Sequence, residues 1–576
     1  MKRLTLTVLA LFMVTILNAQ VEDDWTKKMK ESQENAIKEF EQFTQQAIQE
    51  YEDFRRQANE EYARFMAEAW KMFETQPAVE PPAKPKPTVP LVNNTNPLPT
   101  PQLTPNPNPD PVPTPKPNPV PTPDPNPVPN PNPDPDPVPN LNPVPTPNID
   151  PASTPDPDPI PIPDPVTVPN PSLEPGPMVT PIRIPDPVVL PQLSKPDMIQ
   201  AERPKPMEPI IPNAVPMVAA QNVFLYGSSF AFHLGEQPEL KLKDASEKSV
   251  AKMWKQLSDP SFDNIIAECL QQREKRNLCD WAYIKLTQRV AETHCGEGTN
   301  EAVVMQMYLL TQSGYQMRIG RDDSNHLALL IGSKEQIYRY KYFVMDGTKF
   351  YVLNRSFNKK GLSIFDHAFP KEKSFSLALT QPDLQVDKAE KRTITSKHYP
   401  NVSVTVQTNR NLIAFYNEYP ASAMWHYYSL ASLSDVVKGA LYPALRKAIE
   451  GKTDLQAANI LLDFVQTGFE YKTDDEQFGY ERPLYPDESI YYPYCDCEDR
   501  SILFSCLIRE LLGLEVVLLD YPTHISTAIC FKEEVAGDYF MMDGKRYVIS
   551  DPTFINASVG MCPSKYKKVA PSVIRF

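Results

Sequence analysis

A proline-rich stretch constrains this chain more than any other feature. Between residues 77 and 216, 51 of 140 residues are proline, and most alternate with Asn, Asp, Thr, Val or Lys. Proline fixes its own φ and moves the preceding residue out of the helical region, so helices and central strands are excluded here. We therefore predict a disordered or polyproline II linker over residues 77–216 that acts as a rigid spacer. Short epitopes for aromatic-grooved domains are the alternative.

The first residues predict an export signal. Lys2 and Arg3 precede an apolar run over residues 4–17, and a cleavage point follows, so residues 1–19 have the pattern of a signal peptide. The apolar run is too short to span a membrane, and no later stretch is long and apolar enough. We expect a periplasmic or secreted product without a transmembrane anchor after signal removal.

A helical segment separates the signal from the linker. Residues 22–75 contain neither Pro nor Gly, and a pattern of aromatic residues and Ala recurs at 39–47, 50–58 and 61–69. The repeat of 11 residues averages about 3.67 residues per helical turn, which is typical of a long amphipathic helix with slight right-handed supercoiling. We expect this helix to self-associate as a coiled coil, or to dock on another surface.

The composition becomes globular from about Met217, and the sequence then contains one unit twice. Residues 342–354 align without gaps on residues 539–551, and each reads as a strand, an Asp-Gly turn and a second strand. A strand opened by a His and a helix ended by a Gly precede each hairpin. We predict an α+β architecture with two tandem domains, at residues 217–408 and 409–576.

The second copy holds a candidate catalytic set. Cys497 stands where Asp496 caps a predicted helix, whose apolar part runs over residues 502–512. The positive pole of this helix would lower the pKa of the thiol. His524 opens one strand and Asp551 closes another, at successive intervals of 27 residues. A catalytic thiol needs a base and a group that holds that base in one tautomer. We predict Cys497 as nucleophile, His524 as base and Asp551 as orienter.

These residues carry a family resemblance. Their order, the stretch Asp496-Cys497-Glu498-Asp499 at a helix start, and Asp551-Pro552-Thr553 after a hairpin resemble the transglutaminase-like superfamily, in an exported bacterial form. The resemblance covers residues 460–557 well and residues 295–354 weakly. It implies papain-like domains in which Cys497 forms an acyl-enzyme. The family includes crosslinking enzymes, peptidases, amidases and non-catalytic members.

The chain departs from the family pattern near the nucleophile. The Gly that commonly precedes the catalytic Cys is missing, and Cys495 lies two residues before Cys497. The second oxyanion donor has three candidates: Gln477, Tyr492 and Tyr494.

The first copy of the repeated unit lacks a cysteine at the position of the predicted nucleophile. Gly298 stands at the position that corresponds to Cys497, and the nearby thiol, Cys295, lies three residues too early. His326 and Asn354 match the base and the orienter. We predict that this copy is a degenerate, binding or structural partner.

The net charge and the cysteine pattern argue against some classes of ligand, and the remaining cysteines have predicted roles of their own. The net charge of -14 argues against nucleic acid. Cys-x-Cys without a His cluster argues against a metal site, and no cofactor is expected. Pairing of Cys495 with Cys562, or with Cys497 under oxidation, stays open. Four thiols are predicted to lie in the core: Cys269, Cys279, Cys506 and Cys530.

Two functions follow from the sequence. The first is an exported acyl-transfer enzyme that attacks a glutamine side-chain amide or a peptide bond of a protein or peptide substrate, with water or an amine as acceptor. The alternative is a non-catalytic binding head on a rigid proline-rich stalk.

Overall fold

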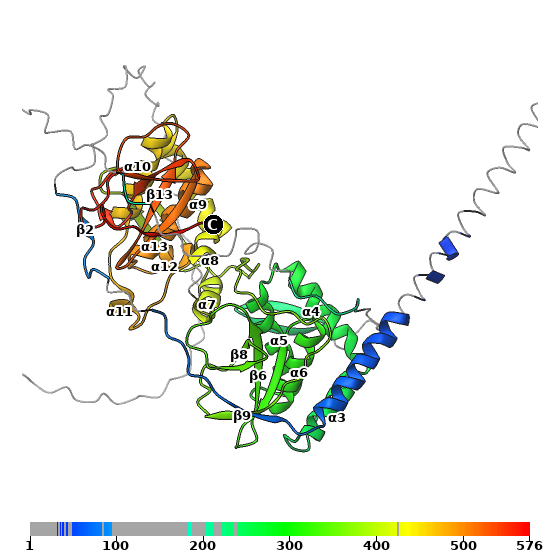
Figure 1. Ribbon diagram of the computed structural model, residues 1–576. Coiled ribbons are helices and arrows are strands. Elements are labelled where there is room, and N and C mark those ends of the chain that lie inside the picture. Colours follow the sequence, from blue (N-terminus) through cyan, green and yellow to red (C-terminus); the bar gives the residue numbers. More distant parts are fainter. Residues whose placement is uncertain are drawn as a thin grey trace, which may run out of the picture. The chain divides into compact units, whose positions relative to one another are not determined.

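A computed structural model describes most of the globular part of the chain. The described residues are 49–82, 86–94, 183–186, 203–210, 220–233, 239–422 and 425–576, with isolated helical positions between 32 and 46. The predicted signal peptide at residues 1–19 and most of the predicted linker lie outside them. The described residues belong to one compact unit and form both helices and sheets, which confirms the α+β class (Figure 1).

The two main sheets have the same strand order. We call residues 217–408 the first half and residues 409–576 the second half, after the two predicted domains. The sheet of the first half has the order β9-β5-β6-β8-β7, with β1 added at the β9 edge, and the sheet of the second half has the order β17-β12-β13-β15-β14. All neighbouring strands are antiparallel. The strands of the first sheet are β1 (Lys71–Glu74), β5 (Met317–Arg321), β6 (Leu327–Ser333), β7 (Tyr342–Met345), β8 (Thr348–Val352) and β9 (Gly361–Phe365). Those of the second are β12 (Glu515–Tyr521), β13 (His524–Cys530), β14 (Tyr539–Met542), β15 (Lys545–Ser550) and β17 (Ser572–Ile574).

Both predicted hairpins are confirmed. β7 turns into β8 through Asp346 (φ 47°) and Gly347 (φ 76°), and β14 turns into β15 through Asp543 (φ 51°) and Gly544 (φ 74°). Positive φ at both central positions is typical of a type I′ turn, whose twist matches that of the flanking strands.

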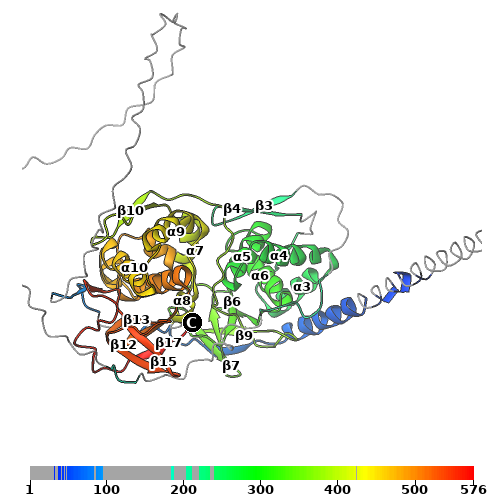
Figure 2. The ribbon, with the colours of Figure 1, turned by 90° about the horizontal axis from the view of Figure 1, so that it is seen from above.

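Helices cover one face of each sheet (Figure 2). The first half contains α3 (Glu247–Leu257), α4 (Asp263–Lys275), α5 (Asp280–Cys295) and α6 (Asn300–Gln312). The second contains α7 (Arg410–Glu418), α8 (Trp425–Leu430), α9 (Asp435–Ile449), α10 (Asp454–Gly468), α11 (Asp474–Gln477), α12 (Pro486–Tyr491) and α13 (Cys497–Leu507), which continues as a π-helical turn, Ile508–Leu512. In the part of the chain that the structure describes, no helix has the length and apolar character to cross a membrane.

Smaller elements complete the fold. A 3-10 turn, Pro260–Phe262, precedes α4. The short strands are β2 (Leu91–Val92), β3 (Gln221–Leu225), β4 (Ser228–Phe232), β10 (Arg392–Thr395), β11 (Ser403–Val406) and β16 (Phe554–Ile555). β2 lies parallel to β16, and the other two pairs, β3 with β4 and β10 with β11, are antiparallel.

The N-terminal helix is shorter than predicted at its carboxyl end. Residues 22–75 were expected to be helical throughout, but the described helix ends at residue 66, and Lys71–Glu74 form β1 against β9. An unpaired sheet edge offers the backbone hydrogen bonds that replace helical ones. Tyr62 and Met66 are buried, and the ring of Tyr62 lies 4.9 Å from that of Trp254.

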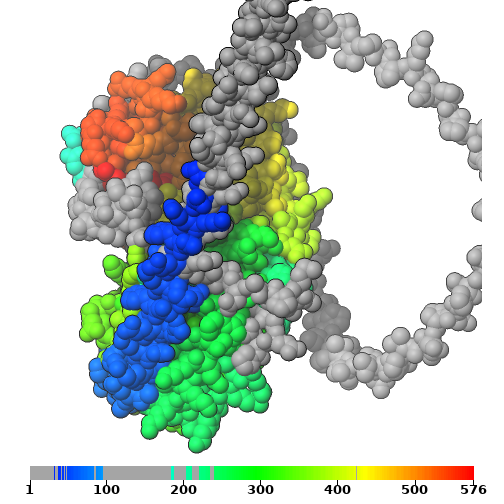
Figure 3. All heavy atoms as spheres, turned by 90° about the vertical axis from the view of Figure 1, so that its right-hand side faces the viewer, coloured from blue at the N-terminus to red at the C-terminus, as the bar shows by residue number. Residues whose placement is uncertain are grey.

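The helix packs on its own chain. Figure 3 shows its described part, in blue, along residues of the first half, in green, and Arg55 forms an ion pair with Asp263 of α4. Docking on another surface is therefore confirmed for this end of the helix. Further toward the N-terminus, Tyr51 and Phe54 are 40% and 47% exposed, and self-association through residues 22–75 stays a prediction.

The proline-rich stretch was predicted to be a rigid spacer, but its described parts at residues 91–92 and 184 contact the globular part of the chain. Residues 91–92 pair with β16, and the buried Ile184 donates its N–H to Tyr539 O at 2.6 Å. The two ends of the intervening segment are thus fixed to the second half. Each anchor has a non-proline residue next to a proline, Leu91 after Pro90 and Ile184 before Pro185, and non-proline residues keep the N–H group that a strand edge requires.

Candidate active site

The buried helix α13 brings the candidate nucleophile beside the second sheet. All of its residues are buried, and it packs against β13 (Figure 1). Ser501 Oγ donates to Ile525 O at 3.1 Å, which ties the first turns of the helix to the start of β13. At the helix start, Asp496 N–H donates to Asp499 Oδ2 at 3.2 Å, as expected for a short-armed capping box. Cys497 and His524 therefore lie at the adjoining ends of two packed elements.

His524 and Asp551 form a buried pair. His524 Nε2 lies 2.8 Å from Asp551 Oδ2, and neither side chain is exposed to solvent. The other carboxylate oxygen accepts the N–H groups of Thr553, at 2.9 Å, and Phe554, at 3.2 Å. Since one oxygen of Asp551 faces Nε2 and the other is held by two backbone donors, this pairing assigns the Nε2–H tautomer to His524. Nδ1 is then the proton acceptor. Nδ1 is buried and has no hydrogen-bond partner.

Two further side chains hold this pair, and the sequence analysis did not identify either. Gln466 of α10 donates from Nε2 to the carbonyl oxygens of Asp551, Phe554 and Ala557, at 3.0, 2.9 and 3.0 Å. The ring of Tyr566 stacks on His524, with centroids 5.1 Å apart and planes at 7°. A polar residue on a mostly apolar helix was a weak signal for Gln466, but Tyr566 gave none.

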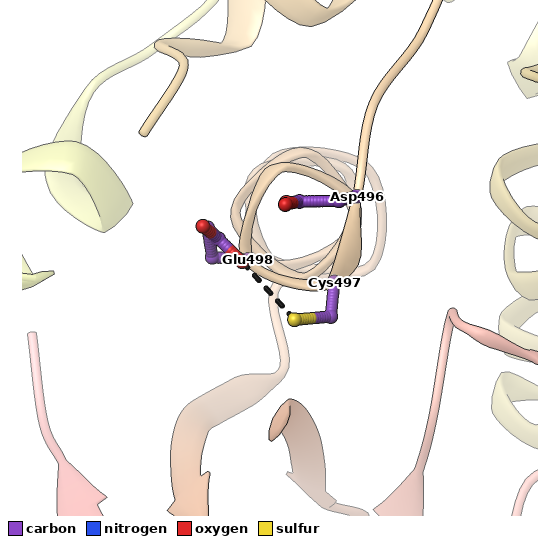
Figure 4. A group of neighbouring side chains, drawn as sticks. All are labelled: Asp496, Cys497 and Glu498. Atoms are coloured by element: carbon purple, nitrogen blue, oxygen red, sulfur yellow. Dashed lines mark hydrogen bonds between the residues drawn. The ribbon is translucent and has the colours of Figure 1, made fainter. Parts of the chain in front are cut away.

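The thiol of Cys497 is directed to a neighbouring carboxylate rather than to His524. Cys497 Sγ donates to Glu498 Oε2 at 3.0 Å (Figure 4), and the structure records no hydrogen bond between this thiol and His524. Burial, followed by the charges of Glu498 and Asp496, raises the pKa of the thiol well above its ordinary value, and Lys86 opposes this rise. The expectation that the helix pole lowers this pKa is wrong for the described state, because desolvation and two carboxylates outweigh the helix end.

Lys86 from the proline-rich stretch lies among four carboxylates next to Cys497. Its Nζ atom is 2.8 Å from Asp496, 2.9 Å from Glu481 and 3.5 Å from Asp474, and it also contacts Glu498. Burial alone raises the pKa of Glu498, but Lys86 and neighbouring donors bring it down to about 2. Burial raises the pKa of Asp474 and Asp496 well above the ordinary value.

The same acidic side chains have the spacing of metal ligands. Three groups of donor atoms lie close enough together to hold an ion: Asp496, Cys497 and Glu498; Asp474, Asp496 and Asp499; Asp474, Glu481 and Glu498. In this structure the ammonium group of Lys86 lies among these carboxylates and supplies the positive charge that a metal ion would otherwise bring. The predicted absence of a metal or cofactor stays a prediction.

The first half does not assemble the corresponding set. Its helix α6 begins at Asn300, where α13 begins at Cys497. The side chain of His326 is 76% exposed, Asn354 accepts the N–H of a residue in its own turn, and Cys295 lies at the end of α5. No hydrogen bond joins these three predicted residues in the described structure. His326 and Asn354 line a cavity of about 770 Å³, and Cys295 is not part of its lining.

One of the three oxyanion candidates has a free donor. Gln477 Nε2 is buried without a hydrogen-bond partner, whereas Tyr492 Oη donates to Asn417 at 2.8 Å. The ring of Tyr494 lies 3.9 Å from Lys472 Nζ. Gln477 is thus the candidate with an unused N–H group.

All eight cysteines are free, so Cys495 forms no disulfide with Cys497 or Cys562. Of the four thiols predicted to lie in the core, Cys269, Cys279 and Cys506 are buried, and Cys530 is half-buried.

Comparison with family models, with curated proteins and with solved structures finds no match to this chain.

Proposed function

We propose that the second half is a cysteine-dependent acyl-transfer site of the transglutaminase-like kind. Cys497 is the nucleophile, His524 the base and Asp551 the group that orients the base. The observation that carries the proposal is the buried His524–Asp551 pair, in which Nδ1 of the imidazole is left without a partner. A buried Nδ1 without a partner, on a strand packed against the helix that begins with Cys497, has the free acceptor that a general base needs.

The chemistry requires the thiol to rotate from Glu498 toward His524. Nδ1 then takes the proton of Cys497, and Sγ attacks the carbonyl carbon of an amide. The oxyanion forms near the N-terminus of α13, where backbone N–H groups are available, and Gln477 offers a further donor. The imidazolium returns its proton to the leaving amine, and a thioester remains on Cys497. Water or a second amine resolves the thioester and regenerates the thiol.

The substrate is a protein or peptide, and its electrophile is a glutamine side-chain amide or a peptide bond. We also propose that the chain acts after export, to the periplasm or outside the cell, since residues 1–19 have a signal-peptide pattern.

Replacement of the nucleophile tests the proposal. The full chain and its Cys497→Ala variant are incubated with a glutamine-rich peptide pool and a biotinylated primary amine, and ammonia, new amino termini and biotin transfer are measured. Cys530→Ala, at the half-buried end of β13, is the matched control. Activity lost in Cys497→Ala and kept in Cys530→Ala supports the enzyme; equal activity in both variants refutes it.

A binding role is the second candidate. It is favoured by the cavity of the first half, which is lined by aromatic, amide and charged side chains, among them Trp281, Asn300 and Arg355. Ligand sites combine apolar and aromatic walls with a few convergent polar groups, and both kinds of side chain line this cavity. Binding of a peptide that is unchanged in Cys497→Ala, together with no turnover in the unmodified chain, would favour this function.

A further inference from the structure

Residues 86–94, here called the strap, lie across the candidate site. At one end, Lys86 contacts the carboxylates at the start of α13, and Pro87 O accepts a hydrogen bond from Tyr471 at 2.8 Å. At the other end, Leu91 and Val92 pair in parallel with Phe554–Ile555. The strap therefore joins the helix that begins with the nucleophile to the strand that begins three residues after Asp551.

The middle of the strap makes fewer contacts than its ends. The side chain of Val89, between the two ends, is 68% exposed. Asn93 N–H donates to Ile555 O at 2.8 Å, which extends the backbone pairing by one residue. Such an interface consists of one buried cation and a short run of backbone hydrogen bonds. These are the contacts by which an extended peptide usually adds to a strand edge.

The strap also fixes the state of the thiol. Lys86 contacts Glu498, and Glu498 accepts the proton of Cys497 Sγ. With the strap in place, Cys497 is 1% exposed and His524 is fully buried. The strap thus supplies the cation that holds Glu498, the residue to which the thiol proton is directed.

We propose that the surface covered by the strap, from the carboxylates around Lys86 to β16, is a docking site for an extended polypeptide with a basic side chain, and that the strap occupies it as a tethered competitor. The partner's backbone pairs with β16, and its Lys or Arg takes the place of Lys86 among Asp474, Glu481, Asp496 and Glu498. This inference rests on the proposed function for its role in catalysis, but the docking itself does not require a reaction. A tethered segment competes at high effective concentration, so the partner binds strongly only when the strap has left.

Two variants of the full chain open the strap by different routes. Lys86→Glu places a negative charge among four carboxylates, and Asn93→Pro removes the N–H group that donates to Ile555. Lys241→Glu makes the same charge change at an exposed side chain and is the control. Hydrogen exchange of residues 88–94 and the anisotropy of a fluorescent peptide with the sequence of residues 86–94 are measured.

We expect exchange in residues 88–94 to become about a hundredfold faster in both variants and to stay unchanged in Lys241→Glu. The peptide should bind the Asn93→Pro chain at least about tenfold more tightly than the unmodified chain, and a peptide with Glu in place of its Lys should lose that gain. Unchanged exchange in both variants, or equal binding of the two peptides, overturns the inference.

The same samples separate this inference from the proposed function. If the strap opens and the peptide binds, but Cys497 gains no reactivity toward an acyl donor, docking stands and the proposed function fails. If Cys497 reacts equally fast with the strap closed and open, the function stands and the competitor role is refuted.

Discussion

Lys86 Nζ lies 2.8 Å from Asp496 Oδ2, although 410 residues separate them in the sequence. Its side chain is 5% exposed, so a buried contact connects a proline-rich segment to the residue before the candidate nucleophile. Loss of Lys86 would leave the buried carboxylate of Glu498, whose pKa is about 2, without its cation, which is costly. This contact makes the N-terminal part of the chain a component of the site rather than a remote spacer.

Asp551→Asn should slow acyl transfer. Asp551 uses one oxygen for His524 Nε2 and the other for the N–H groups of Thr553 and Phe554, whereas the amide has a single oxygen. If that oxygen stays with the backbone donors, the NH₂ group faces Nε2 and disfavours the Nε2–H tautomer. We expect the rate of thioester formation to fall by about 10²-fold or more, with an unchanged melting temperature within a few degrees. Asp543→Asn, in the exposed hairpin turn, should keep the full rate. A rate for Asp551→Asn within twofold of the unmodified chain would contradict the orienting role.

Gln466→Leu should destabilise the second half. Three carbonyl oxygens, including that of Asp551, would lose their shared donor. We expect the free energy of unfolding to fall by about 3 kcal/mol, as measured by urea denaturation. Gln407→Leu removes a hydrogen bond to the single carbonyl of Ala389 and should cost less than about 1 kcal/mol. Equal losses in the two variants would show that Gln466 does not hold this loop.

Glu488 should make stability depend on pH. Burial outweighs the nearby Arg482 and raises the pKa of Glu488 to about 7, from 4.5. Below pH 4.5 the carboxyl is protonated in both the folded and the unfolded chain, so its stabilising effect is fully present there. Between pH 4.5 and 7 only the unfolded chain releases the proton, so stability falls as pH rises, by about 3 kcal/mol in all.

The Glu488→Gln variant isolates this effect, because its amide does not titrate. Urea denaturation at pH 5 and pH 7.5 should show that the unmodified chain loses about 2.4 kcal/mol more than the variant, because pH 5 already lies inside the titration window. Asp487, whose pKa burial raises to about 6, is present in both chains and cancels from the difference. The same pH dependence in the two chains would contradict a protonated Glu488.

Asn59→Leu should weaken the contact between the N-terminal helix and the first half. Asn59 Oδ1 accepts from Trp254 Nε1 at 3.1 Å and from Gln312 Nε2 at 2.9 Å. Leucine would leave both buried donors unpaired, so we expect a loss of about 2 kcal/mol in the free energy of unfolding. The neighbouring exposed change, Glu60→Gln, should have an effect near zero. Similar values for the two variants would indicate that the helix does not stay docked in solution.

The sequence was sufficient for features that local signals determine. The Asp-Gly pairs at residues 346–347 and 543–544 require positive φ, and the structure has the hairpins there. A cap residue before an apolar run placed the start of α13 at Cys497, and the structure begins the helix at that residue. These signals depend on a few adjacent residues, so no tertiary information was needed.

Features that depend on distant contacts could not be predicted. Lys86 lies in a repetitive Lys-Pro context, and nothing in it indicates a partner near residue 496. The thiol pKa was expected to fall because only the helix pole was visible in the sequence; burial and two carboxylates reverse its direction. The helix predicted to reach residue 75 ends at residue 66 because the free edge of β9, formed almost 300 residues later, pairs with residues 71–74.

The most direct test of the acyl-transfer site is the identification of the acylated residue. The full chain, its Asn93→Pro variant and its His524→Ala variant are treated with p-nitrophenyl acetate, quenched in acid, digested and analysed by mass spectrometry. We predict a hydroxylamine-sensitive acetyl group on Cys497, more of it in Asn93→Pro, and a loss of at least about tenfold in His524→Ala. Acetyl groups spread evenly over the cysteines, or acetylation of Cys497 that is the same without His524, would contradict the site.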